Sequence, residues 1–152
     1  MYKRRVNVRG IIYKDGKIFA QKLKSKVNST ENNYWSTPGG GMDDGEDVLS
    51  ALHREMIEET GVAPVIDRLL LIQQFYDGEK EQLELFFLIT NAEDYEVLDL
   101  AATSHGEIEV SQYGFIDPHK EYILPEVLRD MDFESLIAAP APVVISNELP
   151  PL

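Results

Sequence analysis

The sequence contains no cysteine. This absence excludes disulfide bonds, thiolate zinc sites and cysteine nucleophiles together. No run of 18 or more apolar residues is present, so the sequence predicts no membrane-spanning helix and no membrane partner. The basic N-terminus leads into a stretch of alternating polarity and not into an apolar segment, which argues against a secretion signal. By default, these absences favour a cytoplasmic protein.

Positive charge is also scarce. The chain has 14 Lys and Arg residues against 27 Asp and Glu residues, and its net charge is −13 at pH 7. We expect no nucleic acid polymer as a partner, because binding a DNA or RNA backbone depends on many basic contacts with phosphates. Nine of the basic residues lie between positions 3 and 26. They form either a solvated basic edge strand or contacts with the phosphates of a small ligand, for which Arg9, Lys22 and Lys24 are candidates.

The length and the apolar content fit one domain. The chain has 152 residues, of which 43% are hydrophobic, enough for a single core. We expect this domain to span residues 1–137. Residues 138–152 hold four of the eight prolines and are predicted to form a C-terminal tail. The tail is either disordered or packed against the domain or a neighbour, and the sequence leaves a homodimer open.

Four segments have the composition of β-strands. Residues 5–12 alternate between polar and apolar, and residues 17–24 follow after an Asp-Gly pair that favours a hairpin turn. Residues 66–75 and 82–90 are apolar on both faces, as in strands that are covered on both sides of a sheet. A second Asp-Gly pair between these two strands predicts their turn.

The remaining elements are one strand and two helices. The strand is predicted at residues 107–116, and the helices at 47–60 and 125–137. Gly61 follows the first helix at the position of a left-handed C-terminal cap, and Pro125 suits the first turn of the second helix. Together the elements predict an α/β fold, in which a mixed sheet is sandwiched between helices.

The first helix carries three acidic residues at an unfavourable place. Glu55, Glu58 and Glu59 lie in its last turns, near the negative end of the helix dipole. Their spacing of three and four places them on one face, where like charges repel. A bound divalent cation reverses this argument, because clustered carboxylates then form the hard-oxygen site that magnesium prefers.

Two further features precede these carboxylates. Arg54 lies among them, and Glu46 lies at the start of the helix, two turns upstream. We infer that Arg54 bridges back to Glu46 and ties the glycine-rich segment 39–41 to the helix. Glycines allow such a segment to turn tightly and to bring a carbonyl group close to a ligand.

The whole segment resembles the Nudix box of the Nudix hydrolase family. Its fixed positions are, in order, Gly40, five residues, Glu46, seven residues, Arg54-Glu55-Met56, one residue, Glu58-Glu59, one residue and Gly61-Val62. Every fixed position is matched, and the preceding segment 35–40 also looks like the usual lead-in of the family. The box covers about a sixth of the chain, and its seven strictly fixed residues together arise by chance about once in 10^8 trials.

The resemblance implies a fold, a reaction and a metal. The fold is a sheet sandwiched by helices, and the reaction is hydrolysis of the diphosphate linkage in a small-molecule nucleoside diphosphate derivative. The resemblance further implies Mg2+ or Mn2+ bound by Glu55, Glu58, Glu59 and the carbonyl of Gly39. It assigns Glu46, Arg54 and the box glycines Gly40 and Gly61 to the support of the loop.

The catalytic base and the substrate contacts stay open in the sequence. A carboxylate must take the proton of the attacking water. Glu55 is one candidate. The resemblance also admits a glutamate from a later segment in this role, for which Glu107 and Glu109 are candidates; being two residues apart, they would face the same side of a strand. Phe75 and Tyr76 lie at a strand end, where either could stack on a nucleobase. Nucleoside triphosphates and nucleotide sugars are equally compatible with the sequence.

Three other function classes compete with hydrolysis. A non-catalytic Nudix-fold module that senses a nucleotide is the main alternative, although intact Glu55, Glu58 and Glu59 argue against it. An isomerase acting on an isoprenoid diphosphate resembles a family branch with a catalytic cysteine, which this chain lacks. A glycosidase would place its paired carboxylates on separate elements across a sugar, not together on one helix turn.

Overall fold

The computed structural model describes residues 3–25, 28, 30–147 and 149. Its strands are, in chain order, β1 (Arg4–Ile11), β2 (Tyr13–Lys14), β3 (Lys17–Leu23), β4 (Trp35–Ser36), β5 (Gly39–Gly41), β6 (Ile66–Tyr76), β7 (Glu81–Ile89), β8 (Val110–Ile116), β9 (Ile123–Leu124) and β10 (Val143–Ser146). The α-helices are α1 (Val48–Thr60), α2 (Gly106–Glu109) and α3 (Phe133–Ala138). The 3-10 helices are η1 (Ala92–Tyr95), η2 (Leu100–Ala102) and η3 (Glu126–Asp130).

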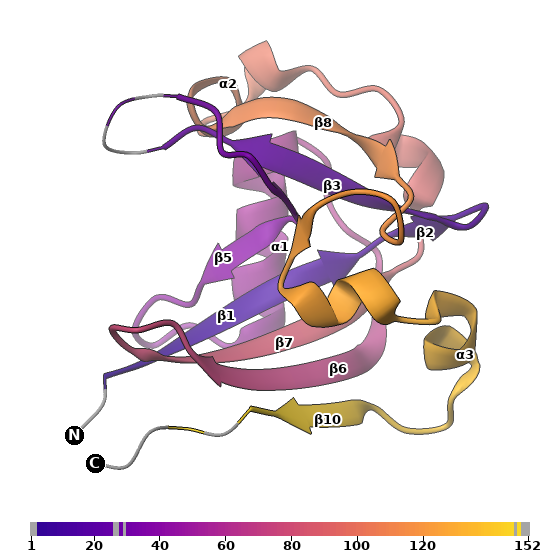
Figure 1. Ribbon diagram of the computed structural model, residues 1–152. Helices are drawn as coiled ribbons and strands as arrows, with labels where there is room; N and C mark the ends of the chain where they lie inside the picture. The colour runs from indigo at the N-terminus through magenta and orange to yellow at the C-terminus, as the bar shows by residue number, and fades with distance from the viewer. Residues whose placement is uncertain (1–2, 26–27, 29, 148, 150–152) are drawn as a thin grey trace.

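The strands form two mixed sheets. The first has the order β10-β6-β7-β1-β5, with β1 and β7 parallel and β6 and β7 joined as an antiparallel hairpin. The second has the order β2-β3-β4-β9, and β8 pairs with β3 outside this path. Both sheets are visible in Figure 1, where α1 lies behind the strands and α3 lies at the right of the view. The predicted α/β fold, a mixed sheet between helices, is confirmed, although the strands divide into two sheets.

Local signals explain the ends of α1. Asp47 caps its N-terminus by accepting a hydrogen bond from the Ser50 amide at 2.9 Å. Gly61 ends it in the left-handed conformation, at φ +77°, and donates its amide to the Ile57 carbonyl. The predicted helix and its glycine cap are therefore confirmed. No basic residue lies in the last turn of the helix, so the dipole is not offset from within that turn.

The predicted strand at 107–116 is wrong at its start. Glu107 and Glu109 lie on the one-turn helix α2, and β8 begins only at Val110. The preceding residues cross the end of α1, where the His105 amide donates to the Glu58 carbonyl at 3.0 Å. Amides within α2 then bond back to the His105 carbonyl. Because the backbone is helical, residues two apart lie on nearly opposite sides, so Glu107 and Glu109 do not share a face.

The predicted helix at 125–137 is divided in two. Residues 126–130 form the 3-10 helix η3, and Met131 and Asp132 are extended. Asp132 then starts α3 as its N-cap, by accepting a hydrogen bond from the Ser135 amide at 3.1 Å. A capping residue inside an otherwise helical pattern therefore restarts the helix in a new direction.

Part of the predicted tail belongs to the first sheet. Strand β10 lies parallel to β6, with Val143 opposite Leu71 and Ser146 opposite Gln74. The Asn147 amide extends the pairing by donating to the Gln74 carbonyl at 3.0 Å. Residues 148 and 150–152 lie outside the described part of the chain.

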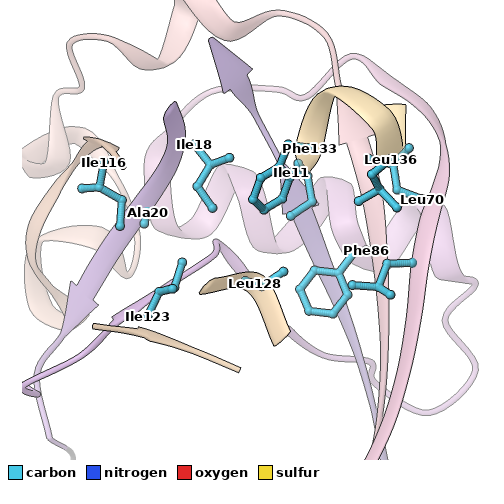
Figure 2. Packing of buried hydrophobic residues seen from close by; sticks show 11 residues of the cluster. Ile11, Ile18, Ala20, Leu70, Phe86, Ile116, Ile123, Leu128, Phe133 and Leu136 are labelled. Carbon is cyan, nitrogen blue, oxygen red and sulfur yellow. The ribbon is translucent and has the colours of Figure 1, made fainter. Parts of the chain in front are cut away.

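Two groups of buried side chains cover the faces of the first sheet. One group, shown in Figure 2, joins Ile11, Leu71 and Phe86 of the sheet to Phe133 and Leu136 of α3. The other joins the sheet to α1, and it contains Val8, Phe87, Ala51, Leu52 and Met56. These two layers hold the helices against opposite faces. Within the described residues, no helix is long and apolar enough to span a membrane.

The packing of α1 leads to a stability prediction. Leu52 has no exposed surface, whereas Leu49 on the same helix is 52% exposed. Leu52→Ala should lower the free energy of unfolding by about 2–5 kcal/mol, because it leaves a cavity in the core. Leu49→Ala should change it by less than about 0.5 kcal/mol. Urea unfolding followed by circular dichroism measures both, and equal losses would contradict the described packing.

Candidate functional site

The glycine segment β5 lies directly against β1. Arg9 pairs with Gly39, and Val8 pairs with Gly40, in antiparallel register. Gly39 has φ +134°, and a Cβ atom there would lie 2.0 Å from the Val8 carbonyl oxygen, so no other residue fits. A Cβ atom on Gly40 would lie 2.8 Å from the carboxylate of Glu55. The glycines thus bring the backbone of β5 into close contact with the carboxylate of α1.

Arg54 ties this segment to the helix. Its Nε and Nη2 atoms donate to the two carboxylate oxygens of Glu46 at 2.7 and 2.9 Å. The same Nη2 donates to the Gly41 carbonyl at 3.2 Å, and Glu46 also accepts from the Asp43 amide at 2.9 Å. Arg54 lowers the pKa of Glu46 to about 2, so this carboxylate stays charged. The expected bridge between Arg54 and Glu46 is present.

The same guanidinium group reaches two more carboxylates. Its Nη1 atom donates to Glu55 and to Glu58, in both cases at 3.1 Å. The Nδ1 atom of His105 lies 3.1 Å from the carboxylate of Glu58. Arg54 therefore balances part of the negative charge at the end of α1, where the spacing of the acids alone predicts repulsion.

Glu59 lies in a different environment. Its residue surface is 4% exposed, and its carboxylate accepts from the Gln21 side-chain amide at 2.6 Å and the Gly39 amide at 3.2 Å. Neither of these donors is charged, and burial raises the pKa of Glu59 to about 8. Gln21 was not among the predicted site residues, since nothing in the strand pattern of residues 17–24 marks it as a partner of the helix.

Glu55 and Glu107, the two candidate bases, differ in exposure. The side chain of Glu55 is 14% exposed, and burial raises its pKa. Glu107 is exposed on α2, and its side chain makes no hydrogen bond or ion pair with the described residues. Only its backbone carbonyl is bonded, by Lys24 Nζ at 3.3 Å. Between the two, Glu55 alone touches the glycine segment.

A metal ion would need a rearrangement of these side chains. Across residues 3–25, 28, 30–147 and 149, no three Asp, Glu or His side chains are grouped so that they could hold a metal ion. Glu55 and Glu58 turn toward Arg54, and Glu59 turns toward Gln21 and Gly39. The donor types nevertheless suit a hard divalent cation. In addition, a buried carboxylate without a charged hydrogen-bond donor, such as that of Glu59, is stabilised by a cation.

The predicted substrate contacts are separated in space. Arg9 lies at the glycine segment, where its Nη1 atom donates to the Thr37 and Gly39 carbonyls at 3.2 and 3.3 Å. Lys22 lies 5.2 Å above the ring of Trp35 instead. The Tyr76 hydroxyl donates to the Gly78 carbonyl at 2.9 Å, in the turn that follows β6. Arg9 alone of the three contacts the glycine segment.

A cavity of about 620 Å³ opens beside Arg9. Its lining comes from β1, β6, β7 and β10 on one side and from β4 and η3 on the other, and it includes Tyr34, Gln73, Phe75 and Glu84. Of the two aromatic residues considered at the end of β6, Phe75 lines this cavity. Gln73 was not among the predicted site residues, because no motif marks a single glutamine in an apolar strand.

Comparisons with known proteins agree with the box. The family model of the NUDIX domain matches residues 1–131. An RNA pyrophosphohydrolase of Caulobacter vibrioides is 28% identical over an alignment of 119 residues, and the match covers 69% of this chain and 68% of that protein. An RNA pyrophosphohydrolase of Pelagibacter ubique is 40% identical over 55 residues, which are 36% of this chain but only 32% of that protein.

A solved structure shows the same fold. The crystal structure of a MutT NUDIX hydrolase from Burkholderia pseudomallei matches with a TM-score of 0.61 at 24% identity, over 81% of this chain and 89% of that chain. Nudix hydrolases generally use divalent metal ions, in keeping with the donor types at the end of α1. The family model matches most of the sequence, the box is complete and the fold is shared with a Nudix hydrolase. The chain therefore belongs to the Nudix hydrolase family.

Proposed function

We propose that this protein hydrolyses the diphosphate linkage of a nucleoside diphosphate derivative in a reaction that depends on Mg2+ or Mn2+. The observation that carries the proposal is the contact of the Glu55 carboxylate with the glycine segment, beside Glu58 and Glu59 on the same helix. The names of the relatives add support, since they are RNA pyrophosphohydrolases. The cavity beside Arg9 has a volume within the usual range for small-molecule sites.

The proposed metal ligands are Glu55, Glu58, Glu59 and the Gly39 carbonyl. When bound, a divalent cation neutralises phosphate oxygens and lowers the pKa of a coordinated water. Arg54 is a positioning residue in this proposal, because it ties the glycine segment to the helix through Glu46. Gly40 and Gly61 shape the backbone on either side of the carboxylates.

Glu55 is our leading candidate for the general base. A carboxylate whose pKa is raised by burial is better matched to proton transfer near neutral pH than an exposed one. It also lies against the glycine segment that carries the proposed carbonyl ligand. Glu107 is the second candidate, since α2 packs against the end of α1 through the hydrogen bond from His105 to Glu58.

Arg9 is the proposed link between the cavity and the carboxylates. It contacts the Gly39 carbonyl, and it also lines the cavity. A nucleotide with its base in the cavity would direct its phosphates toward Arg9 and the end of α1. Lys22 and Tyr76 are weaker candidates, because neither contacts the glycine segment nor lines this cavity.

The 5′-triphosphate end of an RNA is a second candidate substrate. Two observations favour it: the names of the relatives, and a second hollow of about 450 Å³ that is lined by Lys3, Arg4, Arg5 and Lys80. The hollow adjoins the loop after β5 through Asp43 and Asp44. A few basic residues could hold the phosphate next to a 5′ end, even though the net charge of −13 disfavours binding of a long polymer.

A product screen tests the proposed activity. The protein would be incubated with Mg2+ or Mn2+ and nucleoside triphosphates, nucleotide sugars and a short 5′-triphosphorylated RNA. Mass spectrometry of the products would identify the substrate and the bond that breaks. If no compound is hydrolysed with either metal, while nucleotides still bind, the non-catalytic sensor module is the better description.

The metal ligands lead to a prediction for Glu58. Glu58→Gln should lower kcat by at least about 100-fold, because even the partners of metal ligands are worth about 10–100-fold. Glu121→Gln, at an exposed position on the loop before β9, should leave kcat unchanged. Initial rates at saturating Mg2+ measure both. Near-normal turnover of Glu58→Gln in a folded protein would remove Glu58 from the proposed ligands.

A second pair of variants tests which residue is the general base. Glu55→Gln should lower kcat by about 10^2–10^4-fold, the usual contribution of a general base, and Glu107→Gln should lower it less than about threefold. Single-turnover rates separate the chemical step from product release. If Glu107→Gln lowers kcat more than Glu55→Gln does, Glu107 and not Glu55 is the general base.

Metal binding has a readout that needs no turnover. A cation that binds only the folded state should raise the free energy of unfolding by about 2.7 kcal/mol at a concentration 100 times its Kd. We expect Mg2+ to raise the melting temperature of the unaltered protein and to raise that of Glu58→Gln less. A rise of equal size in both proteins would mean that the ion binds elsewhere.

A further inference from the structure

We propose that Gln73, together with the C-terminal strand β10, selects a nucleobase that carries an exocyclic amino group. The inference rests on the proposed function, since it assigns the cavity beside Arg9 to the base of the substrate. It adds a specificity residue that belongs neither to the box nor to the predicted substrate contacts. The cavity, its lining and the unpaired amide of Gln73 carry the argument.

The side-chain amide oxygen of Gln73 is buried and has no hydrogen-bond partner among the described residues. The residue is 4% exposed, and its Oε1 atom is buried without a partner in the described part of the protein. Leaving such a group unpaired is costly, whereas pairing it with a ligand recovers the hydrogen bond. Glu84, opposite Gln73 on β7, differs, because it accepts from Arg9. Among the described residues, Asn7, Gln21 and Thr37 also bury an unpaired side-chain oxygen, but of these four residues Gln73 alone lines the cavity.

The register of the sheet aims Gln73 and Phe75 into the cavity. Residues two apart on a strand face the same side, and both of these residues of β6 line the cavity. On the adjacent strand β10, Ile145 pairs with Gln73, and Ile145 and Asn147 line the same cavity. An amide is therefore flanked by an aromatic ring and an aliphatic side chain, an arrangement that suits a flat heterocycle.

The charges around the cavity favour a ligand that donates hydrogen bonds. Glu84, Glu126 and Asp130 contribute carboxylates to the lining, and Arg9 contributes the cation. Arg9 is already bonded to Glu84 and to the Thr37 and Gly39 carbonyls. An exocyclic amino group would donate to the amide oxygen of Gln73, and the amide nitrogen would donate to an adjacent ring nitrogen. Glutamine recognises adenine in this two-bond manner in other contexts.

Strand β10 lies beyond the part of the chain that the family model matches. The model ends at residue 131, and β10 spans Val143–Ser146. The strand nevertheless lines the cavity through Ile145, and the bond from the Asn147 amide to Gln74 holds its end in place. This side of the cavity therefore lies outside the matched domain, and we assign to it the tight fit around the nucleobase.

Cytidine and uridine monophosphate provide the cleanest test. The two molecules have the same sugar, phosphate and ring size, but only cytosine has the amino group and the accepting ring nitrogen. We expect the unaltered protein to bind the cytidine compound at least about tenfold more tightly, because the cytosine amino group donates to the amide oxygen of Gln73 among the carboxylates of the lining, whereas uracil turns a carbonyl oxygen toward these acceptors. Gln73→Met, which keeps the size of the side chain, should reduce this ratio to about one. Isothermal titration calorimetry with Mg2+ present measures the four dissociation constants.

Matched variants separate the preference for one nucleobase from a change in the shape of the cavity. Ser146→Ala lies on β10 but faces away from the cavity, so the ratio should stay unchanged. Ile145→Ala should weaken both ligands by a similar factor, because it widens the cavity without touching the amide. Melting temperatures would first confirm that each variant is folded. If Gln73→Met does not fold, Glu126→Gln at the exposed rim replaces it and should lower the ratio severalfold.

The outcomes distinguish this inference from the proposed function. Equal binding of the two monophosphates by the unaltered protein, or an unchanged ratio in the folded Gln73→Met protein, would overturn the role of Gln73. If nucleotides are hydrolysed without any preference between the bases, the proposed function stands and this inference fails. If the amino-bearing base is preferred through Gln73 but no nucleotide is hydrolysed, the inference stands and the proposed function fails.

Discussion

The guanidinium group of Arg54 connects the parts of the candidate site. It binds both oxygens of Glu46, the Gly41 carbonyl, Glu55 and Glu58 at distances between 2.7 and 3.2 Å. A planar group with five donors can satisfy so many acceptors at once, which a lysine could not do. The glycine segment, the start of the helix and its last turns are therefore held by one side chain.

This arrangement explains how the helix tolerates its charges. Glu55, Glu58 and Glu59 lie at the negative end of the dipole, and no basic residue lies in the last turn. Arg54 offsets Glu55 and Glu58 from within the helix, and Gln21 bonds Glu59 from strand β3. Under the proposed function, a bound divalent cation would offset Glu55 and Glu58 in part, while Arg54 would keep its bonds to Glu46 and Gly41. The same acids can therefore be stable in the protein and available to a metal.

The first sheet changes character along one face. Near α3 this face is apolar, with Ile11, Leu71 and Phe86 in the buried layer. Further along the same strands it becomes polar, with Arg9, Gln73 and Glu84 around the cavity. One continuous surface thus supports both the core and the proposed binding site. The addition of β10 at the edge extends this surface beyond the matched family domain.

The sequence by itself determined the features that depend on neighbours along the chain. The helix from Asp47 to Gly61 and the bridge from Arg54 to Glu46 follow from capping and spacing within a few turns. The strands β1, β3, β6 and β7 follow from alternation, from apolar runs and from Asp-Gly turns. The family follows from the spacing in the box, and the model match to residues 1–131 shows it independently.

Only the tertiary structure decided the features that depend on distant segments. Glu107 and Glu109 were expected on a strand, but the bond from His105 to the end of α1 places them on a helical turn. The cavity brings Arg9, Gln73 and Ile145 together from three strands that lie far apart in the sequence. Pairing between remote strands is set by packing and not by local pattern. For this reason the sequence pointed to the carboxylates of α1, whereas the fold revealed the cavity beside Arg9.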